Sequence, residues 1–62
     1  MIILRFAEVA ARTGLSRTTI YAAIKENTFP RQIKLGKRAS GWVEEEIESW
    51  IEQKINAREI SK

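Results

Sequence analysis

The chain has 62 residues and a net charge of +3, contains neither Cys nor His, and has only Glu among its eight acidic residues. A chain this short buries only about 60% of its unfolded surface on folding, which leaves room for one domain over residues 1–62. Because thiolates and imidazoles are the nucleophiles, bases and soft ligands of most small sites, we expect no catalytic triad, no metal site, no cofactor and no enzyme activity.

Charge is distributed unevenly along the chain. Residues 1–41 carry eight basic and two acidic side chains, a net charge of +6, whereas residues 42–62 carry three basic and six acidic ones, a net charge of −3. Such asymmetry is typical of a protein with one half facing a polyanion and the other half serving as a scaffold. The same charges also fit two ordinary solvated faces, so charge alone does not decide.

Apolar stretches are short throughout the chain. The longest, residues 1–4, falls far below the roughly 20 residues that span a bilayer, and a basic residue follows it where a signal peptide would stay apolar. We therefore expect no membrane segment, and the absence of Cys agrees with a reducing cytosol.

The first predicted element is a short helix over residues 5–13. Three apolar residues have the i, i+3, i+4 spacing that places them on one helix face, namely Phe6, Val9 and Ala10. Gly14 can take the left-handed conformation that ends a helix, and the Ser16 hydroxyl can accept a hydrogen bond from an amide of a following helix. The pattern predicts two helices joined by a tight turn.

The second predicted helix covers residues 17–27. Its inner stripe consists of Ile20, Ala23 and Ile24. Asn27 tolerates the left-handed conformation of a helix end. Pro30 prevents continuation, because it lacks an amide proton and pushes the preceding residue out of the helical region. We therefore expect an extended chain after this helix.

Residues 31–43 predict a small β-hairpin. An alternating segment, residues 32–35, and a final apolar pair are separated by turn-forming residues 36–41. Lys37 and Arg38 would lie at the tip of this hairpin, which is therefore basic.

The third predicted helix covers residues 44–57, and residues 58–62 are expected to fray. Its apolar residues recur at helical spacing, namely Ile47, Trp50, Ile51 and Ile55. Glu residues occupy positions 44–46, where the positive end of the helix dipole favours carboxylates. Val43, at the expected N-cap, has no side-chain acceptor, so this helix start lacks the cap expected for the second helix.

Two short helices, a tight turn and a basic hairpin predict a mainly α fold: a small winged helix-turn-helix with three helices and a two-stranded β-hairpin wing. The inner stripe of the second helix would rest on the first helix and on Trp50, which leaves its other face exposed. Arg17 would then enter the major groove and pair with guanine, and Thr18 would meet a base edge or a thymine methyl. Lys25 is better placed for a phosphate.

The wing supplies a second expected contact with DNA. Lys37 and Arg38, supported by Arg31 and Lys34, would reach the adjacent backbone or the minor groove. One such domain has a modest interface, so a homodimer or tandem binding on DNA is compatible with this arrangement.

Several side chains have an alternative structural interpretation. Thr18 and Thr19 often have no partner at a helix start, and Arg12 is expected to be solvated. Tyr21 packs on Phe29 or on the wing as readily as it contacts DNA. Four aromatic residues fall on apolar stripes and are expected in the core rather than under bases, namely Phe6, Phe29, Trp42 and Trp50.

A longer pattern runs through nearly the whole chain. It reads TGLSRTTIY, IKE, FP, IKLG, an Arg, GW, EI and WI, from Thr13 to Ile51. In this pattern the chain resembles the AlpA family of prophage regulators, which implies a winged helix-turn-helix of the MerR-like or excisionase-like kind. The family's DNA-facing positions correspond to Ser16, Arg17, Thr18, Thr19, Tyr21 and Lys25 in the second helix and to Lys34, Lys37 and Arg38 in the wing.

Two positions depart from the family pattern. Ala22 stands where many relatives have a basic or bulky residue, and Asn27 stands where they often have Gly. Ala22 implies the loss of one phosphate or base contact and a different site preference, whereas Asn27 implies little change.

The resemblance implies a sequence-specific DNA-binding transcriptional regulator of a prophage or mobile element, acting on excision or integration genes. Two alternatives stay open: an excisionase-like architectural factor that assists an integrase, and a protein-interaction module, such as an anti-repressor, that uses the acidic face of residues 44–52. The first function implies double-stranded DNA as partner, optional contact with an integrase or RNA polymerase, no membrane, and a cytoplasmic location at the nucleoid.

Overall fold

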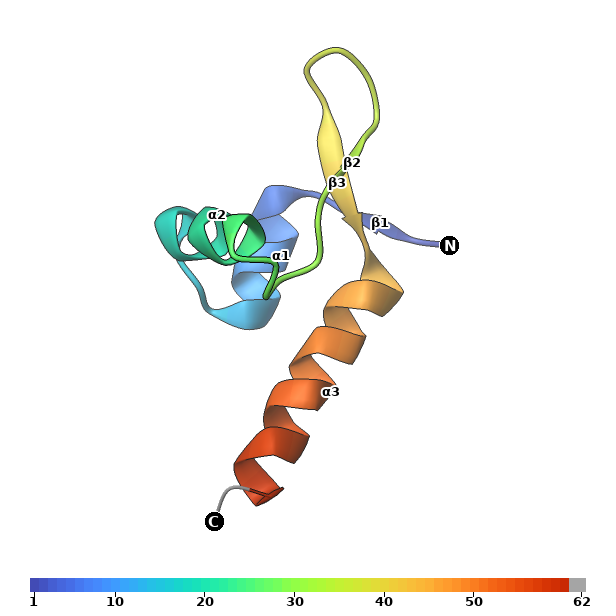
Figure 1. Ribbon diagram of the computed structural model, residues 1–62. Coiled ribbons are helices and arrows are strands. Elements are labelled where there is room, and N and C mark those ends of the chain that lie inside the picture. Colours follow the sequence, from blue (N-terminus) through green and yellow to red (C-terminus); the bar gives the residue numbers. More distant parts are fainter. Residues whose placement is uncertain (61–62) are drawn as a thin grey trace.

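The computed structural model describes residues 1–60, with side chains described for residues 1–58. Three helices and three short strands follow one another along the chain, namely β1 (Ile3–Leu4), α1 (Phe6–Thr13), α2 (Arg17–Lys25), β2 (Ile33–Lys34), β3 (Ser40–Val43) and α3 (Glu44–Ile60). The strands form an antiparallel sheet in the order β1-β3-β2. The fold is thus mostly helical with a small wing, which confirms the predicted fold class (Figure 1).

Helix α1 is bounded by local hydrogen bonds. The Arg5 amide donates to Glu8 Oε1 at 3.1 Å, so Arg5 lies outside the helix as its N-cap. At the other end Gly14 has a φ of 72°, and its amide donates to the Ala10 carbonyl at 2.7 Å. This is the left-handed helix end expected for Gly14.

Helix α2 begins at the expected cap and ends two residues before the predicted boundary. Ser16 Oγ accepts a hydrogen bond from the Thr19 amide at 3.2 Å. Asn27 has a φ of 63°, and the amide of Thr28 donates to the Ala23 carbonyl at 2.9 Å. This six-to-one bond closes a Schellman motif, in which the left-handed residue lies outside the helix. Asn27 is therefore the stop signal and not the last helical residue.

Strands β2 and β3 form the expected hairpin. Ile33 pairs with Gly41 and Lys34 pairs with Ser40. The Leu35 amide donates to the Ala39 carbonyl at 2.8 Å and closes the loop between the strands. The basic tip of the wing lies in this loop.

The sheet has a third strand that the sequence did not predict. In β1, Ile3 pairs with Val43 and Leu4 pairs with Trp42, so β3 is the central strand. Ser40 and Gly41, expected in the turn, belong to β3. A two-residue strand is too short to give a periodic signal, and its partner lies some forty residues away.

Helix α3 follows β3 directly and replaces the missing side-chain cap with a backbone bond. The Glu44 amide donates to the Ile2 carbonyl at 2.9 Å, so the chain next to β1 satisfies the first amide of α3. The helix reaches Ile60 and therefore includes residues 58–60, which were expected to fray. Residues 61–62 lie outside the described part of the chain.

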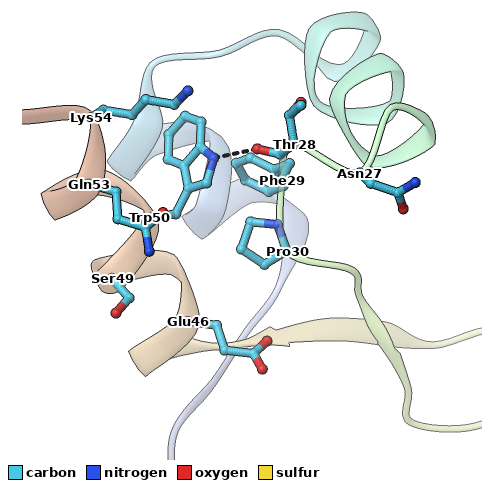
Figure 2. Close-up of a pocket in the computed structure, with 9 residues that line it drawn as sticks. All are labelled: Asn27, Thr28, Phe29, Pro30, Glu46, Ser49, Trp50, Gln53 and Lys54. Atoms are coloured by element: carbon cyan, nitrogen blue, oxygen red, sulfur yellow. Dashed lines mark hydrogen bonds between the residues drawn. The ribbon is translucent and has the colours of Figure 1, made fainter. Parts of the chain in front are cut away.

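The hydrophobic core joins every element except β2. Its buried residues are Leu4, Val9, Ile20, Phe29, Trp42 and Ile47. Two indole N–H groups hold the segment after α2. Trp42 Nε1 donates to the Pro30 carbonyl at 2.9 Å. Trp50 Nε1 donates to the Thr28 carbonyl at 2.7 Å, the bond drawn in Figure 2. This segment links α2 to the wing, so both are anchored to one core.

The helices include no candidate for a membrane span. Within residues 1–60, none combines the length and the apolar character that crossing a bilayer requires.

Candidate nucleic-acid interface

The exposed side of α2 carries the side chains predicted from sequence. All six predicted positions of this helix and its cap are exposed, namely Ser16, Arg17, Thr18, Thr19, Tyr21 and Lys25. Ile20 lies on the opposite side and is fully buried. The apolar stripe therefore turns this face toward solvent, as its spacing predicts.

Two of these side chains hold the start of α2. Ser16 Oγ accepts the amide of Thr19 at 3.2 Å and donates its own proton to Thr19 Oγ1 at 3.0 Å. The Ser16 hydroxyl therefore both donates and accepts within the chain, while the Thr19 hydroxyl still has its own proton to donate.

Arg17 and Tyr21 converge on a residue of α1. The Arg17 Cζ atom lies 4.1 Å from the centroid of the Phe6 ring. The Tyr21 ring is nearly parallel to the same ring, at 6° between planes and 6.2 Å between centroids. Tyr21 thus stacks on Phe6 of α1, a partner that the structural alternative did not name.

Phe6 was expected in the core, and its role at this surface was missed. It is half-buried and packs against the core, with its ring centroid 6.3 Å from that of buried Trp42. Helical spacing reports that Phe6 faces inward, but it carries no information on which residues of another helix cross its ring. Phe29 and Trp42 are buried as expected, and Trp50 is half-buried against the core.

The wing presents the second group of predicted side chains. Lys34, Lys37 and Arg38 are exposed, and the last two lie in the loop between β2 and β3. This loop projects from one end of the molecule, away from the free end of α3 (Figure 1). Arg31 is also exposed, but it bonds back to the end of α2, donating from Nη2 to Asn27 Oδ1 at 2.9 Å.

The positive charges of this surface are not neutralised internally. Six of the ten predicted residues are cationic, namely Arg17, Lys25, Arg31, Lys34, Lys37 and Arg38. Within the described residues, none of them forms an ion pair with a carboxylate. These exposed segments therefore keep an unneutralised positive charge, which suits a polyanion.

Arg12 behaves differently and corrects the expectation that it is only solvated. Its Nη2 atom lies 3.2 Å from Glu44 Oε2, and its Nη1 atom lies 3.7 Å from Glu48 Oε2. The two carboxylates are one turn apart on α3, so one guanidinium reaches both. Arg12 thus joins α1 to the acidic start of α3.

A groove lies apart from this surface, between α3 and the segment after α2. Phe29, Pro30 and Trp50 form its apolar part, and Glu46 and Lys54 border it (Figure 2). None of the ten predicted site residues lines it. The groove is therefore separate from the cationic surface.

Comparisons with known proteins identify the family of the chain. A family model described as "Prophage CP4-57 regulatory protein (AlpA)" matches residues 2–55. The chain is 40% identical over 55 residues to the uncharacterized protein ORF88 of Enterobacteria phage P4, covering 89% of this chain and 62% of the phage protein. It is 38% identical over 58 residues to the DNA-binding transcriptional activator AlpA of Escherichia coli (strain K12), covering 84% of this chain and 83% of the activator. The chain therefore belongs to the AlpA family of prophage regulatory proteins.

Proposed function

We propose that this protein binds double-stranded DNA and activates transcription of prophage genes. The observation that carries the proposal is the set of exposed cationic side chains on α2, on the segment after it and on the wing, none of which is paired with a carboxylate among the described residues. The E. coli relative, which is named a DNA-binding transcriptional activator, supports the same function and its direction.

Helix α2 is the recognition helix in this proposal. A helix fits the major groove of B-form DNA, and the residues at its start reach base edges. Arg17 pairs with a guanine through two hydrogen bonds, and Thr18 contacts a base edge or a thymine methyl. Lys25, at the other end of the helix, neutralises a phosphate.

The wing provides a second contact beside the first. Lys37 and Arg38 at its tip reach the neighbouring phosphates or the minor groove, with Lys34 on the adjacent strand. Arg31 is tied to Asn27 at 2.9 Å, so we assign it a phosphate contact close to the end of α2. Together these contacts set the orientation of α2 in the major groove.

The genes under control are proposed to be those for excision or integration of the mobile element. A reporter fused to such a promoter tests transcriptional activation, and an excision assay with an integrase tests an architectural role. Activation of the reporter in the absence of integrase supports the regulator. Excision that depends on the protein while the reporter stays silent favours the architectural factor.

Binding itself is tested by a gel-shift assay with DNA from upstream of the protein's own gene. Arg17→Ala is expected to weaken binding by about 5- to 150-fold, through the loss of a base-specific arginine pair. Arg38→Ala is expected to weaken it through the loss of a phosphate or minor-groove contact. Lys54→Ala is the matched control, because it removes one positive charge from α3 and outside the proposed surface. Equal affinity of wild type and both arginine variants would show that DNA binds elsewhere or not at all.

The recognised sequence is found by selecting bound fragments from a random DNA pool. Two half-sites at a fixed spacing indicate a dimer, and a single short site indicates a monomer. A pool that stays random after selection contradicts sequence-specific binding.

A further inference from the structure

The inference concerns Phe6 and rests on the proposed function. Phe6 lies at the start of α1, outside the helix proposed to enter DNA, and its ring is half-buried. Two residues of α2 contact this ring from the exposed side: Arg17, with Cζ at 4.1 Å from the centroid, and Tyr21, nearly parallel at 6.2 Å. Arg17 and Tyr21 are one helical turn apart, so a single ring receives both.

We propose that Phe6 is a positioning residue for base recognition, whose ring holds the Arg17 guanidinium in a fixed orientation at the start of the recognition helix.

The contact with Phe6 leaves the hydrogen-bond donors of Arg17 free. A guanidinium stacks through its flat face, while its five N–H donors lie in its plane and point outward from the edge. Within the described residues, Arg17 donates no hydrogen bond and forms no ion pair. The contact with the ring therefore uses none of these donors in a hydrogen bond, and they stay available to pair with guanine.

The ring that supports Arg17 is itself held in place. Phe6 packs against the core and meets Trp42, which is fully buried, at 6.3 Å between centroids and 52° between planes. Trp42 in turn donates from its indole nitrogen to the Pro30 carbonyl. Arg17 is thus connected through one half-buried ring to the rigid centre of the fold, although it is exposed to solvent.

This restraint has an energetic consequence for binding. A free arginine side chain has several rotatable bonds, and ordering it on binding reduces affinity. A guanidinium that is already stacked loses less freedom when it pairs with a base, so the contact contributes more to affinity and to discrimination. The cation–π attraction supplies the stacking without any competing carboxylate.

A double-mutant cycle tests the proposal with two DNA duplexes, one holding the selected site and one in which the guanine read by Arg17 is changed. Phe6→Leu keeps an apolar side chain and removes the ring. It is expected to weaken binding to the selected site by about 3- to 10-fold, the range for ordering one long side chain. Binding to the changed site is expected to alter by less than about 2-fold, because Arg17 has no base partner there.

The decisive comparison is made in the Arg17→Ala background. If Phe6 acts through Arg17, Phe6→Leu causes no further loss there, whereas a general packing role gives the same loss in both backgrounds. Phe6→Tyr keeps an aromatic ring at this position and is expected to bind DNA with wild-type affinity. Phe29→Leu is the matched control, since it makes the same substitution at a buried ring that packs against Trp50 at 4.8 Å.

Each variant is measured at a temperature where circular dichroism shows it to be folded. A loss that persists without Arg17, that affects both duplexes equally, or that Phe29→Leu reproduces overturns the positioning role alone. A wild-type protein with no affinity for any DNA overturns the proposed function instead. The two failures are therefore told apart by the wild-type titration.

Discussion

Replacing Gly41 by Ala tests whether the central strand requires a residue without a side chain. Gly41 is buried in β3, and a Cβ at this position would lie 2.6 Å from Ile3 Cγ2 and 2.9 Å from the Leu4 carbonyl oxygen. Carbon atoms in good contact are about 3.5–4.0 Å apart, so the overlap with Ile3 is about 1 Å. The Ile3 side chain can rotate away, but the Leu4 carbonyl belongs to the backbone of β1. The strand itself must therefore shift.

The cost of this shift is large for so small a protein. Forcing an extra carbon into a packed site costs about 1–3 kcal/mol. The unfolding entropy of 62 residues is about 0.13 kcal/mol/K. A loss of about 2 kcal/mol therefore lowers the Tm by about 15 °C. Since a chain of this size has a stability of about 3–9 kcal/mol, the variant is expected to remain folded at room temperature.

Thermal unfolding followed by circular dichroism measures the effect, and Gly36→Ala is the matched control. A Cβ at Gly36 would have no atom within 4 Å, so its Tm is expected to change by less than about 4 °C. The double variant Ile3→Ala/Gly41→Ala is expected to have a lower Tm than Ile3→Ala alone, because the contact with the Leu4 carbonyl remains. This difference in Tm is expected to be smaller than that between Gly41→Ala and wild type, because the contact with the Ile3 side chain is gone. Equal Tm values for Gly41→Ala and Gly36→Ala would refute the steric argument.

Three further predictions follow from the contacts of the helices and the wing. Ser16→Ala removes the cap of α2 and is expected to lower the free energy of unfolding in urea by about 1 kcal/mol. Thr18→Ala removes no cap bond and is expected not to destabilise the protein, so equal effects of the two variants would contradict the role of the cap. Arg12→Ala breaks two ion pairs at the surface and is expected to lower the stability by less than about 1 kcal/mol, a difference that vanishes near 1 M salt. A loss of stability that salt does not change would show that Arg12 acts through packing and not through its charge. Log affinity for DNA is expected to fall with log salt concentration at a slope of roughly −4 to −5, and Arg38→Ala is expected to make the slope shallower by about 1; a slope near zero in a salt titration would rule out phosphate contacts.

The helix ends could be predicted because each depends on one residue and its neighbours. Gly14 and Asn27 both adopt positive φ, and Ser16 accepts an amide of the next helix. Pro30 then forbids a return to helix. These signals are local in sequence, so the two helices, the turn between them and the start of the wing can be predicted from the amino-acid sequence.

The contacts that complete the surface depend on tertiary packing and could not be predicted. Pairing of β1 with β3 joins residues some forty positions apart, and Gly41 was assigned to the turn because glycine is typical of turns as well as of close strand contacts. Arg12 meets Glu44 through the crossing of α1 and α3. Phe6 meets Arg17 in the same way, across the turn. Spacing shows which face a residue occupies, but only the crossing of the elements shows what that face meets.

The direct passage from β3 into α3 has a mechanical consequence. Val43 ends the strand and Glu44 begins the helix, so no flexible residue separates the wing from α3. Trp42, the residue before Val43, is buried and holds this junction in the core. In the DNA complex that we propose, a force on the wing tip would therefore reach α3, which extends to the opposite end of the molecule, without crossing a linker (Figure 1). In such a complex, the orientation of the docked wing would also set the direction in which the acidic helix α3 points.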